Sequence, residues 1–79
     1  MIELKEACEI AKKQMESSEV DSIFDIGTSW VIGLRDAVTK EVPDVPPFQV
    51  FKEDGKVDVF FPPDHLEELE NAIEVSIDD

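Results

Sequence analysis

The spacing of apolar residues changes near Val20, from every third or fourth position to every second position. Before this point the apolar side chains recur at helical spacing, at Leu4, Ala7, Cys8, Ala11 and Met15. This spacing places them on one face of a helix, which we expect to end at Ser17 and Ser18. Because a helix and a set of strands must share one core, the change predicts an α+β domain.

Two segments after this change have the alternating pattern of strands. In residues 20–26, Val20 and Phe24 are expected on one face and Ile23 on the other. Residues 30–35 begin at Trp30 and carry apolar side chains on both faces, so we expect this strand to lie centrally in the sheet and Trp30 to be a core residue. The Gly-Thr-Ser segment at 27–29 separates the two strands and predicts a hairpin.

A second hairpin is predicted around the Asp54-Gly55 step. Residues 48–52 and 56–61 alternate apolar and polar side chains, and an Asp-Gly step between strands favours a tight turn. The connection before it, residues 36–47, contains three prolines that exclude a regular helix or a central strand. We therefore predict a four-stranded antiparallel sheet built from two hairpins.

The last predicted element is a helix that begins after Pro62 and Pro63. Asp64 is a suitable N-cap, and Glu67 three residues later completes a capping box. Its expected apolar face consists of Leu66, Leu69 and Ile73. A chain of 79 residues has room for a single domain, residues 1–79, in which this helix and the N-terminal helix cover the sheet.

The charge of the chain restricts its partners. Twenty acidic residues against seven basic ones give a formal net charge of -13. We expect neither nucleic acid nor membrane as a partner, because both require Lys and Arg to neutralise phosphates. A basic protein is the partner that this charge favours. The acidic positions expected to contact it lie in the proline-rich connection, at Asp36, Glu41 and Asp44.

No residue pattern points to catalysis, a metal or a cofactor. Cys8 is the only cysteine and His65 the only histidine, so neither a thiolate zinc cluster nor a His-based triad is supported. Cys8 lies on the apolar stripe and is interpreted as a core residue. Residues 52–56 supply too few oxygens for a calcium loop. The longest apolar stretch, residues 30–34, is too short to span a bilayer. We therefore expect a non-enzymatic cytoplasmic protein.

Phe51 and Phe60 suggest an alternative function, as an interface between two copies of the chain. Alternation places Phe60 on the face opposite Val57, Val59 and Phe61. Either a helix covers that face, or Phe51 and Phe60 form an exposed apolar patch for a partner. In the second case the chain is a homodimer of structural or regulatory use, which would add stability to a small core.

A less favoured alternative is a carrier protein. Residues 24–30, Phe-Asp-Ile-Gly-Thr-Ser-Trp, resemble the serine-bearing segment of acyl carrier proteins. In that case Ser29 would carry a phosphopantetheine arm. Acyl carrier proteins are helical bundles, whereas the pattern after Ser29 is that of a strand and the hairpin around Gly55 has no place in such a bundle.

Three segments together resemble the immunity protein 35 family of small polymorphic-toxin immunity proteins. They are Ser29-Trp30-Val31-Ile32, the hairpin at residues 47–57 with its Phe-Gln-Val-Phe-Lys-Glu-Asp-Gly-Lys-Val sequence, and the proline-led residues 62–69. The resemblance covers most of the chain. It implies a protein that binds and masks one cognate toxin and performs no chemistry, so it supplies no catalytic residues. We therefore expect an immunity or inhibitor protein whose acidic surface blocks a basic effector.

Overall fold

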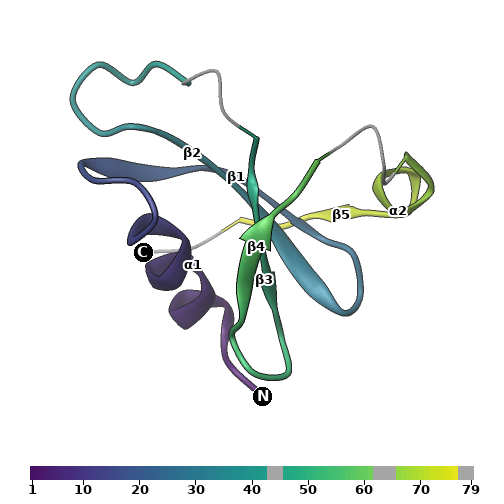
Figure 1. Cartoon of the computed structure of the whole chain (residues 1–79). Helices are drawn as coiled ribbons and strands as arrows, with labels where there is room; N and C mark the ends of the chain where they lie inside the picture. The colour runs from purple at the N-terminus through teal and green to yellow at the C-terminus, as the bar shows by residue number, and fades with distance from the viewer. Residues whose placement is uncertain (43–45, 62–65, 77–79) are drawn as a thin grey trace.

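Helix α1 is followed by a five-stranded antiparallel sheet in the computed structural model, which describes residues 1–42, 46–61 and 66–76. The elements are α1 (Leu4–Lys12), β1 (Ser18–Asp25), β2 (Ser29–Asp36), β3 (Phe48–Phe51), β4 (Val57–Val59), α2 (Leu66–Glu70) and β5 (Ile73–Glu74). The strand order is β4-β3-β2-β1-β5 (Figure 1). The α+β class and both hairpins are therefore confirmed, whereas the expected four strands are five.

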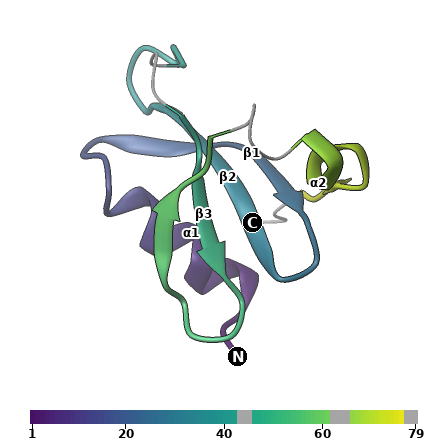
Figure 2. The ribbon, with the colours of Figure 1, turned by 45° about the vertical axis from the view of Figure 1, so that its right-hand side comes forward.

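Helix α1 lies against one face of the sheet (Figures 1 and 2). Glu6 in its first turn and Lys12 in its last turn suit the helix dipole. The helix ends at Lys12, before the expected Ser17, and Ser17 adopts a left-handed backbone with φ of 55° where the chain turns into β1. The Ser18 hydroxyl donates a hydrogen bond of 2.6 Å to the Met15 carbonyl and so stabilises this turn.

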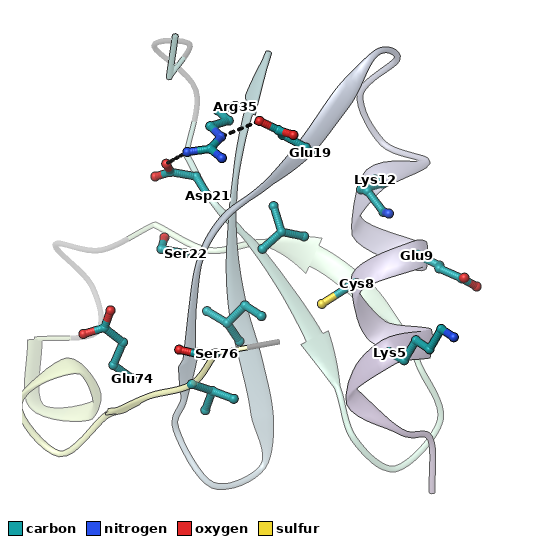
Figure 3. A pocket seen from close by; sticks show the side chains of 13 residues that line it. Lys5, Cys8, Glu9, Lys12, Glu19, Asp21, Ser22, Arg35, Glu74 and Ser76 are labelled. Carbon is teal, nitrogen blue, oxygen red and sulfur yellow. Dashed lines mark hydrogen bonds and ion pairs between the residues drawn. The ribbon is translucent and has the colours of Figure 1, made fainter. Parts of the chain in front are cut away.

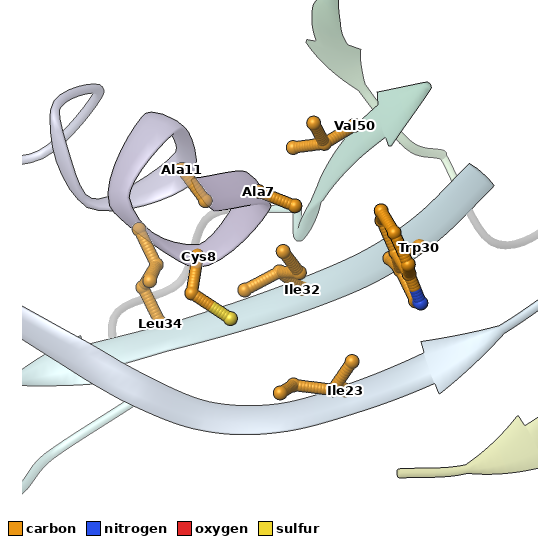
Figure 4. Close-up of a cluster of buried hydrophobic side chains, with 8 residues drawn as sticks. All are labelled: Ala7, Cys8, Ala11, Ile23, Trp30, Ile32, Leu34 and Val50. Atoms are coloured by element: carbon orange, nitrogen blue, oxygen red, sulfur yellow. The ribbon is translucent and has the colours of Figure 1, made fainter. Parts of the chain in front are cut away.

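The main core fills the space between α1 and the sheet (Figure 4). Ile32 lies at its centre, fully buried, and pairs with Ile23 of β1 and Phe48 of β3. The other buried core side chains are Ala7, Cys8, Ala11, Ile23, Trp30, Leu34 and Val50. Both Trp30 and Cys8 are thus core residues, as the sequence predicted.

A β-bulge at Asp21 corrects the predicted faces of β1. The register shifts between Val20 and Ser22, so that Val20 pairs with Leu34 and Ile23 pairs with Ile32. Both side chains therefore pack against the core beneath α1, although strict alternation placed them on opposite faces. Phe24 pairs with Val31 on the other face of the sheet.

The face away from α1 is also partly covered, and Phe60 belongs to it. The Phe60 N–H donates to the Pro47 carbonyl at 2.9 Å, which continues the β3–β4 register by one pair. Phe60 therefore lies on the same side as Asp58 and Val31, and it is fully buried. The expectation that Phe60 forms an exposed patch is therefore wrong, although neither α1, on the opposite face, nor α2, which buries none of its residues, is shown to cover it. Burial of both Val31 and Ile32 confirms that β2 is central.

The C-terminal segment departs most from prediction. Helix α2 has five residues and buries none of them, so it is not the second cover of the sheet that we expected. Leu66 and Ile73, assigned to its apolar face, are 65% and 69% exposed. Ile73 instead starts β5, which pairs with β1, and the Val75 N–H donates to the Ile23 carbonyl. The predicted N-cap, Asp64, lies outside the described residues.

Candidate functional site

Asp36, the first predicted partner-binding residue, organises the loop after β2. Its Oδ1 accepts hydrogen bonds from the N–H groups of Val38 and Thr39, at 2.8 and 2.9 Å. These bonds, that of Thr39 first, hold the pKa of the Asp36 carboxyl below its usual value. The Asp36 N–H also donates to the Glu41 carbonyl at 2.9 Å. Asp36 therefore stabilises a local turn, and its carboxylate is not a free surface charge.

Glu41, the second predicted acidic residue, differs from Asp36. It is exposed, and its carboxylate accepts no hydrogen bond from the described part of the chain. It lies between Val38 and Val42, which are 83% and 62% exposed. Asp44, the third predicted position, lies outside the described residues. The loop thus presents apolar side chains next to negative charge.

An ion-pair cluster lies where β1 and β2 meet this loop. Glu19 Oε1 lies 2.7 Å from both Lys40 Nζ and Arg35 Nε, and these two hydrogen bonds, Lys40 first, lower the pKa of the Glu19 carboxyl. The bulge places Asp21 Oδ1 at 3.5 Å from Arg35 Nη1. Two cations of a cation-poor chain are therefore neutralised by its own carboxylates.

Lys52 forms a second ion pair at the opposite end of the sheet. Its Nζ lies 2.8 Å from Asp25 Oδ1 and 5.0 Å from the centre of the Trp30 ring. The Lys52 hydrogen bond, and then the bond from the Gly27 N–H, lower the pKa of the Asp25 carboxyl. Lys52 is therefore also paired internally, and its ammonium group lies over the ring of the buried tryptophan, in a cation–π contact.

Replacing Asp25→Asn is expected to destabilise the protein more at neutral pH than in acid. A carboxyl whose pKa is lowered by folding stabilises the native state fully above its unfolded pKa of about 4, and this stabilisation is lost as the pH falls through the lower native value. Urea unfolding of wild type and variant between pH 7 and pH 3 measures the difference. Glu53→Gln controls for the loss of one charge. A difference that stays constant with pH would assign the loss to packing.

One hollow of about 560 Å³ lies between α1, β1 and the segment that follows β5 (Figure 3). Cys8 points into it from α1, and Arg35 lies between Glu19 and Asp21 at its rim. Burial raises the pKa of the Cys8 thiol to about 11, so the thiol is protonated at neutral pH and is a poor nucleophile. Basic and acidic residues both line this hollow, so its charge favours neither an anionic nor a cationic ligand.

A second hollow, of about 420 Å³, lies on the β3–β4 hairpin. Its lining combines the apolar side chains of Phe51 and Val57 with carboxylates, and its residues are Thr28, Phe51, Glu53, Asp54, Lys56, Val57 and Asp58. We call the set Phe51, Glu53, Asp54, Lys56, Val57 and Asp58 the hairpin surface, which carries three carboxylates and one lysine. It brings the predicted Phe51 together with acidic residues, but not with Asp36, Glu41 or the buried Phe60. Sequence reasoning missed Asp58, which the register Gln49–Asp58 places beside this hollow.

Ser29 is unsuited to carry a prosthetic arm. It is fully buried in β2, and its Oγ accepts a hydrogen bond of 2.7 Å from Gln49 Nε2. Attachment of a phosphopantetheine group requires an exposed hydroxyl. The sheet and the burial of Ser29 therefore give the carrier alternative no support.

Comparisons with models of protein families, with curated proteins and with solved structures find no match to this chain. Within residues 1–42, 46–61 and 66–76, no three His, Cys, Asp or Glu side chains are grouped so that they could hold a metal ion. In the same part of the chain, no helix has the length and apolar character needed to cross a membrane.

Proposed function

We propose that this chain is a non-enzymatic, cytoplasmic binding protein whose acidic surface masks a basic protein effector, in the manner of an immunity or inhibitor protein. The observation that carries the proposal is the distribution of charge. Three of the seven basic residues, Arg35, Lys40 and Lys52, are engaged by the chain's own carboxylates. Glu41 and the acidic residues of the hairpin surface, in contrast, are exposed to solvent.

This arrangement suits fast capture of a positively charged protein. A net charge of -13 on a chain of 8.9 kDa produces a negative potential that attracts a basic partner before contact. Such steering raises the association rate and weakens with salt, because surface charges are screened over about 8–10 Å at physiological ionic strength. The exposed Val38 and Val42 beside Glu41 supply apolar area for the contact itself. The resemblance to immunity protein 35 points in the same direction.

Reversing charge at Glu41 and Glu53 is expected to slow association about tenfold at low salt and to change dissociation little. The partner is obtained by capture on the tagged full chain and identified, and the rates are then measured with purified proteins. Asp36 stays unchanged, because Asp36→Lys would remove two hydrogen bonds of its own loop. The double variant Glu41→Lys, Glu53→Lys should therefore remain folded.

The matched control, Glu6→Lys with Glu16→Lys, makes the same change in net charge at exposed positions on α1 and in the turn after it. A smaller effect of the control would locate the contact at the loop and the hairpin. An association rate of the Glu41 and Glu53 variant equal to that of the wild type at low salt would contradict the proposal.

A further inference from the structure

Strand β4 lies at one edge of the sheet, and no main-chain group in the described part of the chain pairs with its outer side. It is the first strand in the sheet order, with β3 as its single neighbour among the described strands. The Phe51 N–H donates to Lys56 O, the Phe60 N–H donates to Pro47 O, and Gln49 pairs with Asp58. Alternate residues of an antiparallel strand bond to opposite sides. Val57 and Val59 therefore direct their N–H and C=O groups away from β3.

The side chains along this edge are apolar and accessible. Val59 and Phe61 are each 53% exposed, and they are two positions apart, as residues on one side of an extended chain are. The other edge of the sheet differs, since β5 has two residues and carries Glu74. β4 is itself short, at three residues, but it carries the exposed apolar Val59. An exposed edge strand can pair with a further strand, and proteins usually protect such edges with charge.

The protection of β4 comes from Asp58. Its Oδ1 accepts a hydrogen bond of 2.8 Å from the Val59 N–H, which is a donor that an added strand would need. A cation brought next to Asp58 would pair with this carboxylate and compete with the Val59 N–H for it. The edge is thus matched to a strand that carries positive charge. Glu53 and Asp54 in the adjoining turn add to the attraction, and together with Asp58 they outnumber the single Lys56 there.

We propose that the free edge of β4 docks an extended segment of the basic partner, rich in lysine or arginine, which adds to the sheet as a further strand. This inference rests on the proposed function and names where the partner binds. Main-chain hydrogen bonds to Val57 and Val59 supply the pairing, and Val59 and Phe61 cover apolar side chains of the added strand. Asp58 selects for positive charge.

A second copy of this chain is a poorer occupant. Antiparallel pairing of two β4 strands about a two-fold axis at Asp58, the middle residue of the strand, would place the two Asp58 carboxylates directly opposite each other, and like charges in that position are destabilising. Each copy also carries a net charge of -13. Charge complementarity therefore assigns the edge to a basic segment.

The test uses the full chain and a synthetic peptide of alternating lysine and valine, seven residues long by design, with blocked ends. A control peptide has proline in place of each valine, so that it keeps the charge but cannot form a strand. NMR titration measures the affinity of each, and hydrogen exchange follows the amides of Val57 and Val59. We expect the strand-forming peptide to bind at least tenfold more tightly and to slow exchange at both amides at least tenfold.

Val59→Pro provides the matching variant. It removes an N–H that β3 does not use, and proline is tolerated on an edge strand where the N–H faces solvent, so the fold should persist. We expect peptide affinity to fall at least tenfold. Val42→Pro makes the same substitution at an exposed loop position and should bind as the wild type does.

The outcomes separate this inference from the proposed function. Equal binding of both peptides, unchanged binding by Val59→Pro, or no binding of either peptide would overturn the edge assignment. The proposed function is decided separately, by the association rates of the Glu41 and Glu53 variant. If the chain dimerised without a partner and Val59→Pro abolished the dimer, the edge of β4 would bind a second copy. That result would overturn the proposed occupant.

Discussion

Replacing Phe60→Glu is expected to unfold this domain, not to separate a dimer. Phe60 is fully buried, so the variant must either place a carboxylate in an apolar site or expose the surface around it. Burial of an uncompensated charge costs several kcal/mol, which is comparable to the roughly 5 kcal/mol of stability that a small domain has. Circular dichroism and urea unfolding of the variant measure the loss.

Phe61→Glu is the matched control for this experiment, because the next residue carries the same side chain at 53% exposure. Its effect on the free energy of unfolding should stay within about 0.5 kcal/mol. If Phe60→Glu were folded and as stable as the wild type, Phe60 would be a surface residue. A dimer interface at Phe51 and Phe60 would then be possible again.

Replacing Ile32→Ala is expected to cost about 2–5 kcal/mol of stability. Ile32 is fully buried at the centre of β2, between Ile23 and Phe48 and beneath α1, so the surrounding side chains cannot easily close the cavity. The loss of transfer free energy and the cavity both contribute. Chemical denaturation gives the difference, and a fall in the melting temperature of many degrees accompanies it in a domain of this size.

Two further variants bracket this result. Ile32→Val removes one methylene group and should cost about 0.5–1.5 kcal/mol. Val38→Ala truncates a side chain that is 83% exposed and should be nearly neutral. A cost of Ile32→Ala no larger than that of Val38→Ala would mean that the core between α1 and the sheet is not formed as described.

The candidate site was only partly predictable. Charge alone selected Asp36, but an Asp at a strand end also bonds to the N–H groups two and three residues on, and this local role dominates at Val38 and Thr39. Phe51 was selected as apolar and lies on the hairpin surface. Asp58 and Val59 were missed, because their importance depends on β4 being an edge, which is a property of the whole sheet.

The local elements follow from residue patterns: the first helix from its apolar stripe, and two hairpins from alternation, with the turn of the second at Asp54-Gly55. These features depend on side-chain periodicity and backbone preference within a few residues. Three features required the folded chain: the pairing of β5 with β1, the bulge at Asp21 that turns Val20 to the core, and the burial of Phe60. Each of these features depends on contacts between segments that are distant in the chain. The free energy of such contacts cannot be inferred from a local residue pattern.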